Sequence, residues 1–338
     1  MSSFLQAELG LEQLSEGALE ILQEDIAQIN KTLQEHIRFK VSLPEEIGQH
    51  TLNAGGKRFR PLLVINAARS LSSAFNEHRA ICLGSCMELI HMATLIHDDV
   101  IDHAATRRGQ PTASILFGNT KSILTGDMLL AKAMNVLAED GDLRILKLVS
   151  EMVLEMAEGE VYELQMRGQF ELSQDQHLDI LKMKTASFMR CCCQVGGIVG
   201  GASEEELNRL GEYGYHLGIA FQIIDDLLDF CGDMQLTGKP KAIDFKEGCV
   251  TLPLIFLRDH ISQDQKAFVE SRLGSQDVEE PALQLIQEWM HEAKAFEKAK
   301  SLALTHIQLA KTALEGLPNS SFSEVLEYFC QKIVSRES

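Results

Sequence analysis

The 338-residue sequence predicts an all-α fold, a single-domain helical bundle that spans residues 1–338. Apolar residues recur at three- and four-residue spacing through most of the chain. Val, Ile and Thr do not gather in the short alternating runs that are typical of strands. No Pro- or Gly-rich linker divides the chain, which holds only seven prolines, so we expect one large domain. Residues 1–25 are expected to form an N-terminal helix or a flexible arm.

The expected helices follow one another with short breaks. The apolar spacing predicts Leu11–Ile37, Arg79–Ala104, Ser122–Glu139, Leu146–Met166, Gln176–Val199, Glu204–Phe230, Asp264–Leu273 and Ala282–Leu314. Glycine-containing breaks separate them, and Ser203 is placed as an N-cap ahead of three glutamates. The one long irregular stretch, Gly232–Gly248, is rich in Lys, Asp and Gly. Loops of this length in a compact domain are usually functional or disordered.

The composition limits the partners of the chain. A net charge of −18 argues against nucleic acid or an anionic membrane as the main partner. The N-terminus lacks a basic-then-apolar signal stretch, and no uninterrupted apolar run reaches the ~20 residues of a membrane span. We therefore expect a cytoplasmic protein without a transmembrane segment. The adjacent cysteines Cys191–Cys193 point in different directions on a helix, so they are expected to be buried apolar residues.

Two triplets of aspartates carry the strongest chemical signal. Each has the spacing i, i+1, i+4, which places three carboxylates within an arc of ~100° on a helix. A single triplet of this kind is often only a solvated acidic face. Both triplets, however, lie among Leu, Ile, Met and Phe, where like charges are costly unless a cation neutralises them. Two facing triplets would suit Mg²⁺ that holds a substrate phosphate. The predicted metal ligands are Asp98, Asp99, Asp102, Asp225, Asp226 and Asp229.

With these triplets, the chain resembles the trans-isoprenyl diphosphate synthases, also called polyprenyl synthetases, and especially their long-chain octaprenyl and heptaprenyl members. Further matching stretches are Gly55–Pro61, Arg107–Gly109, Gly126–Asp127, Glu158–Glu160, Lys184–Thr185, Gly238–Lys239, Thr251–Pro253 and Leu317–Pro318. The resemblance implies the isoprenoid synthase fold around a central active-site cavity, usually as a homodimer. It also implies condensation of an allylic diphosphate with isopentenyl diphosphate, with two or three Mg²⁺ ions, for which Mn²⁺ can substitute.

The resemblance assigns basic residues to two diphosphate sites. The isopentenyl diphosphate site matches Lys57, Arg60, His91 and Arg108, and the allylic diphosphate site matches Arg107, Lys184 and Lys239. An arginine suits this role because its planar guanidinium donates hydrogen bonds in pairs. Any of these cations alone is more often a surface residue, and His91 alone would be a core histidine. His91, however, stands seven residues before Asp98, about two helical turns away on the same face.

The implied mechanism is ionisation of the allylic diphosphate, condensation and elimination of a proton. Mg²⁺ held by Asp98, Asp102 and Asp225 would withdraw charge from the allylic diphosphate. Dipoles rather than a full negative charge would stabilise the allylic cation, and the departing diphosphate would take the final proton. The catalytic residues that the resemblance implies are Lys184, Thr185 and Gln222.

Two positions depart from the family pattern. Family members often have a diphosphate-binding Lys after the glycine that corresponds to Gly248, and here that position is Cys249. A glycine that is common at the position of Ala242 is also missing. Lys241 or Lys246 compensates for the lost cation, or the allylic diphosphate binds more weakly.

The residues upstream of the first triplet bear on product length. By resemblance, bulky aromatic residues at the positions of Ala93 and Thr94 would stop the growing tail early, whereas small ones leave its tunnel open. The tunnel floor is then expected near Met134 or Leu137. Helices of ~20 residues span ~30 Å, which favours a product of roughly C30 to C50.

Three other functions compete with this hypothesis. A short-chain farnesyl or geranylgeranyl diphosphate synthase is the first alternative, although short-chain bacterial members of the family insert two more residues into the first motif, where this chain has only two between Asp99 and Asp102. A terpene cyclase shares the fold, but it would have an Asn/Ser/Glu-type second metal site and more aromatic residues than one Trp and four Tyr. A non-catalytic regulatory subunit typically loses one aspartate motif, and both motifs are present here.

Overall fold

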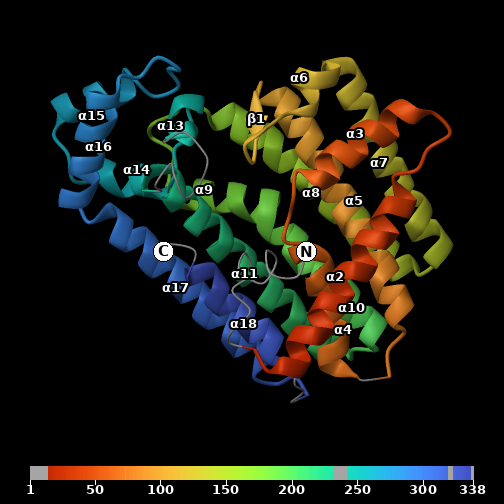
Figure 1. Cartoon of the computed structure of the whole chain (residues 1–338). Coiled ribbons are helices and arrows are strands. Elements are labelled where there is room, and N and C mark those ends of the chain that lie inside the picture. Colours follow the sequence, from red (N-terminus) through yellow and green to blue (C-terminus); the bar gives the residue numbers. More distant parts are fainter. Residues whose placement is uncertain (1–13, 73, 232–241, 319–322, 336–338) are drawn as a thin grey trace. The chain divides into compact units, whose positions relative to one another are not determined.

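The computed structural model describes residues 14–72, 74–231, 242–318 and 323–335, and it confirms the all-α prediction (Figure 1). Its elements are α2 (Glu16–His36), α3 (Ser42–Asn53), α4 (Phe59–Leu71), α5 (Glu77–Ile101), β1 (Thr106–Arg107), β2 (Gln110–Pro111), α6 (Ala113–Phe117), α7 (Asn119–Asp140), α8 (Leu143–Met166), α9 (Gln174–Leu181), the π-helix η2 (Lys182–Ala186), α10 (Ser187–Gly200), α11 (Glu204–Cys231), α13 (Ile243–Glu247), α14 (Leu252–Arg258), α15 (Gln263–Glu270), α16 (Glu280–Glu292), α17 (Ala295–Leu314) and α18 (Ser323–Val334).

The chain divides into two compact units. The first unit comprises residues 1–150, 191–211 and 314–332, and the second comprises residues 151–190, 212–313 and 333–338. The first aspartate triplet belongs to the first unit and the second triplet to the second unit. The single-domain assignment stays a prediction.

Helix α5 is the core helix of the first unit and packs against α2, α4 and α7. It is the one helix among the described residues that is long and apolar enough to cross a membrane, yet 72% of its apolar window is buried inside the structure. The Asn76 side chain caps its first turn by accepting a hydrogen bond from the Arg79 backbone N–H at 3.0 Å. Packing on several sides explains why α5 is apolar around most of its circumference.

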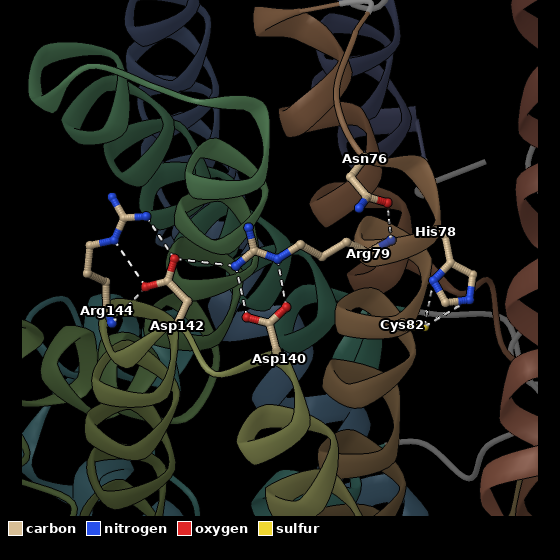
Figure 2. A network of polar contacts seen from close by, with 7 residues as sticks. All are labelled: Asn76, His78, Arg79, Cys82, Asp140, Asp142 and Arg144. Atoms are coloured by element: carbon tan, nitrogen blue, oxygen red, sulfur yellow. Dashed lines mark hydrogen bonds and ion pairs between the residues drawn. The ribbon is translucent and has the colours of Figure 1, made fainter.

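An ion-pair network joins the first turn of α5 to the end of α7 (Figure 2). The Arg79 guanidinium donates to both oxygens of Asp140, at 2.6 and 2.8 Å, and to Asp142 at 3.3 Å. Arg144 also donates to Asp142, at 2.7 Å. Paired bonds of this kind fix orientation as well as distance. The network therefore holds α5 and α7 in register.

A short antiparallel hairpin, β1–β2, follows α5, and the sequence did not predict it. Arg107 pairs with Gln110 across the hairpin, and Gly109 adopts a φ of 73° at its turn. Strands of two residues are too short to show an alternating pattern. The hairpin matters for the site because it fixes the backbone of Arg107 and Arg108.

Three helix or loop boundaries that the sequence predicted between residues 176 and 314 differ from those in the structure. The single helix expected over Gln176–Val199 is interrupted by η2, a π-helical turn of a kind that frequently occurs at functional sites. The helix expected over Ala282–Leu314 breaks at Lys294, whose φ of 53° is left-handed. The stretch Gly232–Gly248 is not irregular throughout, because it contains α13; residues 232–241 lie outside the described residues. Helices α3, α4, α6, α14 and α18 are additional findings.

Candidate active site

A positive electrostatic field surrounds His91 on α5 in the first unit. The pKa of His91 lies well below its ordinary value, first because the ring is buried and then because of the charges of Arg60, Arg108, Arg107 and Arg58. A neutral imidazole among four guanidinium groups marks a place where an anion would be strongly attracted. Three of the predicted diphosphate ligands are therefore close enough to His91 to act on it together, and Arg58 joins them.

The loop before α4 builds this cationic cluster. Gly56 has a φ of 153°, and a Cβ there would lie 2.7 Å from Nη1 of Arg58 and 3.1 Å from Nη1 of Arg108. A side chain at this position would therefore displace the Arg58 guanidinium. Arg58 is buried and donates to Glu88 Oε1 at 3.1 Å, and Arg108 donates to the Gly55 carbonyl oxygen. Arg58 thus anchors the loop to α5, a role that the sequence analysis missed.

The predicted isopentenyl diphosphate ligands Lys57 and Arg60 flank this anchor. Both residues are half-buried, and burial lowers the pKa of the Arg60 guanidinium, an effect that nearby Glu88 partly offsets. Arg60 lies in the first turn of α4, where backbone N–H groups without helical partners add to the positive potential. The cluster therefore combines side-chain charge with a helix N-terminus.

The first aspartate triplet stands at the end of α5, and its members differ in their surroundings. Asp98 and Asp102 are half-buried, whereas Asp99 is buried. Nε of Arg107 donates to Oδ1 of Asp99 at 2.7 Å. Burial raises the pKa of Asp99, although the positive charge of Arg107 opposes the shift. Asp99 thus faces a protein cation, while Asp98 and Asp102 are one helical turn apart and more exposed.

Asp226 in the second triplet is held by two other side chains of the second unit. Its Oδ1 accepts a hydrogen bond from Nε2 of Gln222 at 3.0 Å, and its Oδ2 lies 3.2 Å from Nε2 of His177. Gln222 in turn accepts a hydrogen bond from the Thr185 hydroxyl at 3.0 Å. The structure therefore brings together the predicted residues Thr185, Gln222 and Asp226, and it adds His177.

Asp229 is joined to the start of α13. Its Oδ1 accepts from the backbone N–H of Ile243 and its Oδ2 from that of Asp244, both at 3.1 Å. These bonds satisfy N–H groups in the first turn of a helix, as a capping side chain does. Burial raises the pKa of Asp244 well above its ordinary value, and the charges of Asp229 and Asp226 raise it further. Asp244 is therefore a further acidic residue beside the second triplet, and the sequence analysis did not single it out.

Lys184 lies on the π-helical turn and faces carboxylates of α8. Its Nζ is 2.8 Å from Glu160 and also contacts Glu163. Burial alone would lower the pKa of Lys184, but the attraction of Glu163 and Glu160 outweighs it, so the pKa is raised. Gly159 permits this close approach, because a Cβ there would lie 2.6 Å from Cβ of Met183. Lys184 is therefore a charged group that two carboxylates hold in place.

The segment after α11 explains one departure from the family pattern. Ala242 has a left-handed φ of 55°, a conformation that favours glycine, and this accounts for the glycine that is common at this position. Cys249 is half-buried; burial raises the pKa of its thiol, as do the charges of Glu163 and Asp244. Lys246 is half-buried on α13, while Lys239 and Lys241 lie outside the described residues.

The predicted chain-length residues lie on two helices that pack together, α5 and α7. Ala93 is buried with 2% exposure. Thr94 is half-buried, and its hydroxyl donates to the backbone oxygen of His91 at 2.8 Å. On α7, Met134 is half-buried and Leu137 is buried.

The donor chemistry of the aspartates fits Mg²⁺. Among the described residues, no three His, Cys, Asp or Glu side chains converge as a ready-made metal cage. Mg²⁺ usually binds through one or two carboxylates, several waters and substrate phosphates, so it needs no such cage. Asp98 and Asp102 on α5, and Asp225 on α11, supply hard oxygen donors of this type in each unit.

The sequence of this chain matches a known family over most of its length. The family model for Polyprenyl synthetase matches residues 41–290. Octaprenyl diphosphate synthase of Escherichia coli K12 is 33% identical over 318 residues, which cover 94% of this chain and 98% of that relative. Heptaprenyl diphosphate synthase component 2 of Geobacillus stearothermophilus is also 33% identical, over 88% of this chain and 91% of its own.

Solved structures support the same assignment. A decaprenyl diphosphate synthase from Rhodobacter capsulatus has a TM-score of 0.89 at 31% identity, over 100% of both chains. A polyprenyl synthase from Caulobacter crescentus CB15, complexed with calcium and isoprenyl diphosphate, has a TM-score of 0.89 at 32% identity, over 95% of this chain and 97% of that one. The predicted isoprenoid synthase fold and prenyltransferase activity are thereby confirmed. The chain belongs to the polyprenyl synthetase family.

Proposed function

We propose that this enzyme is a Mg²⁺-dependent trans-prenyltransferase that condenses an allylic diphosphate with isopentenyl diphosphate, head to tail and repeatedly. The observation that carries the proposal is the set of charges along α5. His91 of α5 stands among four arginines from the start of α4 and from the β1–β2 hairpin, and Asp98 and Asp102 follow His91 about two and three turns later. A strongly cationic cluster for one anion next to carboxylates for a metal is what two diphosphate substrates require.

The cationic cluster of the first unit would hold isopentenyl diphosphate. Lys57, Arg60 and Arg108 would bind the phosphate oxygens, and neutral His91 would donate one further hydrogen bond. Each charge-assisted hydrogen bond of this kind is worth about 1.5–3 kcal/mol. Arg58, which anchors the loop to Glu88, would keep these groups in place without binding the substrate itself.

The allylic diphosphate would be held by Asp98, Asp102 and Asp225 through Mg²⁺, with Arg107, Lys184 and Lys239 as direct cations. When bound, Mg²⁺ acts as a Lewis acid that stabilises the charge on the departing diphosphate. Glu160 and Glu163 would keep the charge of Lys184 in one place. This is electrostatic preorganisation, because the charges are fixed before the C–O bond breaks.

The oxygens of Thr185 and Gln222 would stabilise the allylic cation. Both are neutral dipoles, so they favour a carbocation without reacting with it as a carboxylate would. The double bond of isopentenyl diphosphate then attacks, and the released diphosphate accepts the proton that leaves the new chain. We assign no side chain as a general base.

We infer a long-chain product of roughly C30 to C50, since helices of ~20 residues enclose a tail of this length. The small residues Ala93 and Thr94 support this inference, as do the octaprenyl, heptaprenyl and decaprenyl synthases among the relatives. A geranylgeranyl diphosphate synthase of Saccharolobus solfataricus is 29% identical over 93% of this chain and 96% of its own, so a short-chain product is the second candidate.

We further propose a cytoplasmic homodimer that contacts membranes only transiently, during release of the apolar product. An exposed apolar face in the first unit supports dimerisation. Ile115 and Leu116 on α6 are 61% and 51% exposed, and Leu124 on α7 is 57% exposed. Exposed apolar side chains that gather on neighbouring helices can mark subunit contacts.

A coupled assay of diphosphate release tests the proposed reaction. Purified protein should release diphosphate only when farnesyl diphosphate, isopentenyl diphosphate and Mg²⁺ are all present. The name component 2 of the Geobacillus relative raises the alternative that a second protein is required. Release by the purified chain alone would contradict a non-catalytic role, and no release under any of these conditions would contradict the proposal.

A further inference from the structure

Four side chains of the second unit form one continuous hydrogen-bonded relay, Thr185–Gln222–Asp226–His177. The Thr185 hydroxyl donates to Oε1 of Gln222 at 3.0 Å, and Nε2 of Gln222 donates to Oδ1 of Asp226 at 3.0 Å. Nε2 of His177 lies 3.2 Å from Oδ2 of the same carboxylate. The relay therefore connects the π-helical turn η2, helix α11 and helix α9.

The His177 end of the relay is buried and rigidly supported. His177 is 5% exposed and Asp226 is 4% exposed. Helix α9 begins with a capping box, in which Ser173 and Gln176 satisfy each other's backbone N–H groups at 3.2 and 2.9 Å. Leaving a buried polar group without a hydrogen bond destabilises the folded state, so His177 and Asp226 hold each other in place.

The chemistry of the four groups fixes the direction of every hydrogen bond. A carboxylate only accepts, so Asp226 requires an N–H from His177 and an N–H from Gln222. The amino end of the Gln222 amide must then face Asp226, and its oxygen must face Thr185. Two oxygens, Oε1 of Gln222 and Oγ1 of Thr185, are thereby brought to the same place.

We propose that His177 is a positioning residue that, through Asp226, keeps the amide oxygen of Gln222 beside the Thr185 hydroxyl, where both oxygens stabilise the allylic cation. This inference rests on the proposed function. Without the bond from His177, Asp226 can rotate and release the amino end of Gln222. A rotated amide would then present its partially positive N–H groups to a developing cation.

The proposal predicts a particular kinetic signature. An oxygen dipole that faces a carbocation interacts with the transition state and hardly at all with the bound diphosphates. Its loss therefore lowers kcat and kcat/KM together and leaves KM nearly constant. Residues that orient a catalytic group typically contribute about 10- to 100-fold.

The experiment compares His177→Leu, which removes the donor, with His177→Gln, whose amide nitrogen can take the place of Nε2. His306→Leu is the matched control, because it removes another hydrogen-bonded imidazole of the second unit. For each variant, kcat and both KM values are measured, together with Tm. Electron paramagnetic resonance of Mn²⁺ in the presence of inorganic diphosphate reports metal binding without any reaction.

We expect His177→Leu to lose about 10- to 100-fold in kcat, with both KM values and Mn²⁺ binding within about twofold of wild type. His177→Gln should recover most of kcat, and His306→Leu should keep wild-type kcat. Wild-type kcat in His177→Leu, no recovery in His177→Gln, or an equal loss of Mn²⁺ binding would overturn the inference. No reaction by the wild-type enzyme would instead overturn the proposed function, and the inference with it.

Discussion

Nε of Arg107 donates a hydrogen bond to Oδ1 of Asp99 at 2.7 Å, so a predicted diphosphate ligand and a predicted metal ligand are partners. The hairpin β1–β2 presents Arg107, and the last turn of α5 presents Asp99. The pair separates the roles within the first triplet. In the proposed mechanism, Asp99 would orient Arg107 toward the allylic diphosphate, and Asp98 and Asp102 would be metal ligands.

The metal prediction follows from this division. Asp98→Ala and Asp225→Ala should each lower turnover by on the order of a hundredfold or more, because each removes charge stabilisation of the leaving group. Asp99→Asn keeps an oxygen that accepts from Arg107, so its loss should be smaller. A chelator should abolish activity. Steady-state assays check this, with Asp259→Ala, a 64% exposed aspartate side chain, as the control. Near-normal turnover in Asp225→Ala would rule out the paired-metal mechanism.

Cys249 offers a gain-of-function prediction. Burial and the charges of Glu163 and Asp244 raise the pKa of its thiol, whereas the charges of Arg167 and Lys184 lower it. A lysine here would supply the cation that family members often have at this position. Cys249→Lys should lower KM for the allylic diphosphate and leave KM for isopentenyl diphosphate nearly unchanged. Cys249→Ser is the neutral control. A neutral or harmful effect of lysine on allylic binding would indicate that Lys241 or Lys246 already supplies the cation.

Product length should depend on the residues one turn before the first triplet. A phenyl ring at either position would fill the tunnel proposed for the tail. Ala93 is buried and Thr94 half-buried, so the packed interior around them cannot easily yield to the ring. Ala93→Phe or Thr94→Phe should therefore truncate the product to roughly C15 to C20 while sparing the first condensation. Mass spectrometry measures the length, with Ala131→Phe on the exposed side of α7 as the control. Unchanged product length in both variants would mean that the tail follows another path.

Stability should depend on pH through His306. Burial, and then the charge of His216, lower the pKa of His306 to about 4. The unfolded chain has an ordinary histidine pKa of about 6.5, so between these values it binds a proton that the folded state does not. The free energy of unfolding should therefore be full above about pH 6.5 and fall as the pH drops toward 4. Urea titrations from pH 7.5 to 4.5 measure this dependence. His306→Gln should flatten it, and an unchanged slope would contradict the assignment.

The sequence predicted the parts of this structure that depend on local pattern. Apolar spacing predicts long helices such as α5 and α11. The i, i+1, i+4 spacing of the aspartates predicts that the three carboxylates of each triplet lie within one arc of a helix. The π-helical turn could not be predicted, because the apolar spacing of an α-helix continues through Lys182–Ala186 and does not distinguish a π-helical turn from an α-helical one. The break at Lys294 carries neither Gly nor Pro as a signal.

Long-range contacts explain what sequence analysis missed at the site. The partner of Arg58, Glu88, is 30 residues away, and the partner of His177, Asp226, is 49 residues away. No short motif connects such pairs. Arg58 was visible as one cation in a basic loop, but its burial and its anchoring role depend on the packing of α4 against α5.

Product analysis of the wild-type enzyme tests the central claim most directly. The purified chain is incubated with farnesyl diphosphate, excess isopentenyl diphosphate and Mg²⁺, and the product lengths are read by mass spectrometry. We predict all-trans products that extend to roughly C30–C50, consistent with a tail enclosed by helices ~30 Å long. Products that stop at C20, or no extension of farnesyl diphosphate at all, would contradict the long-chain synthase proposed for this protein.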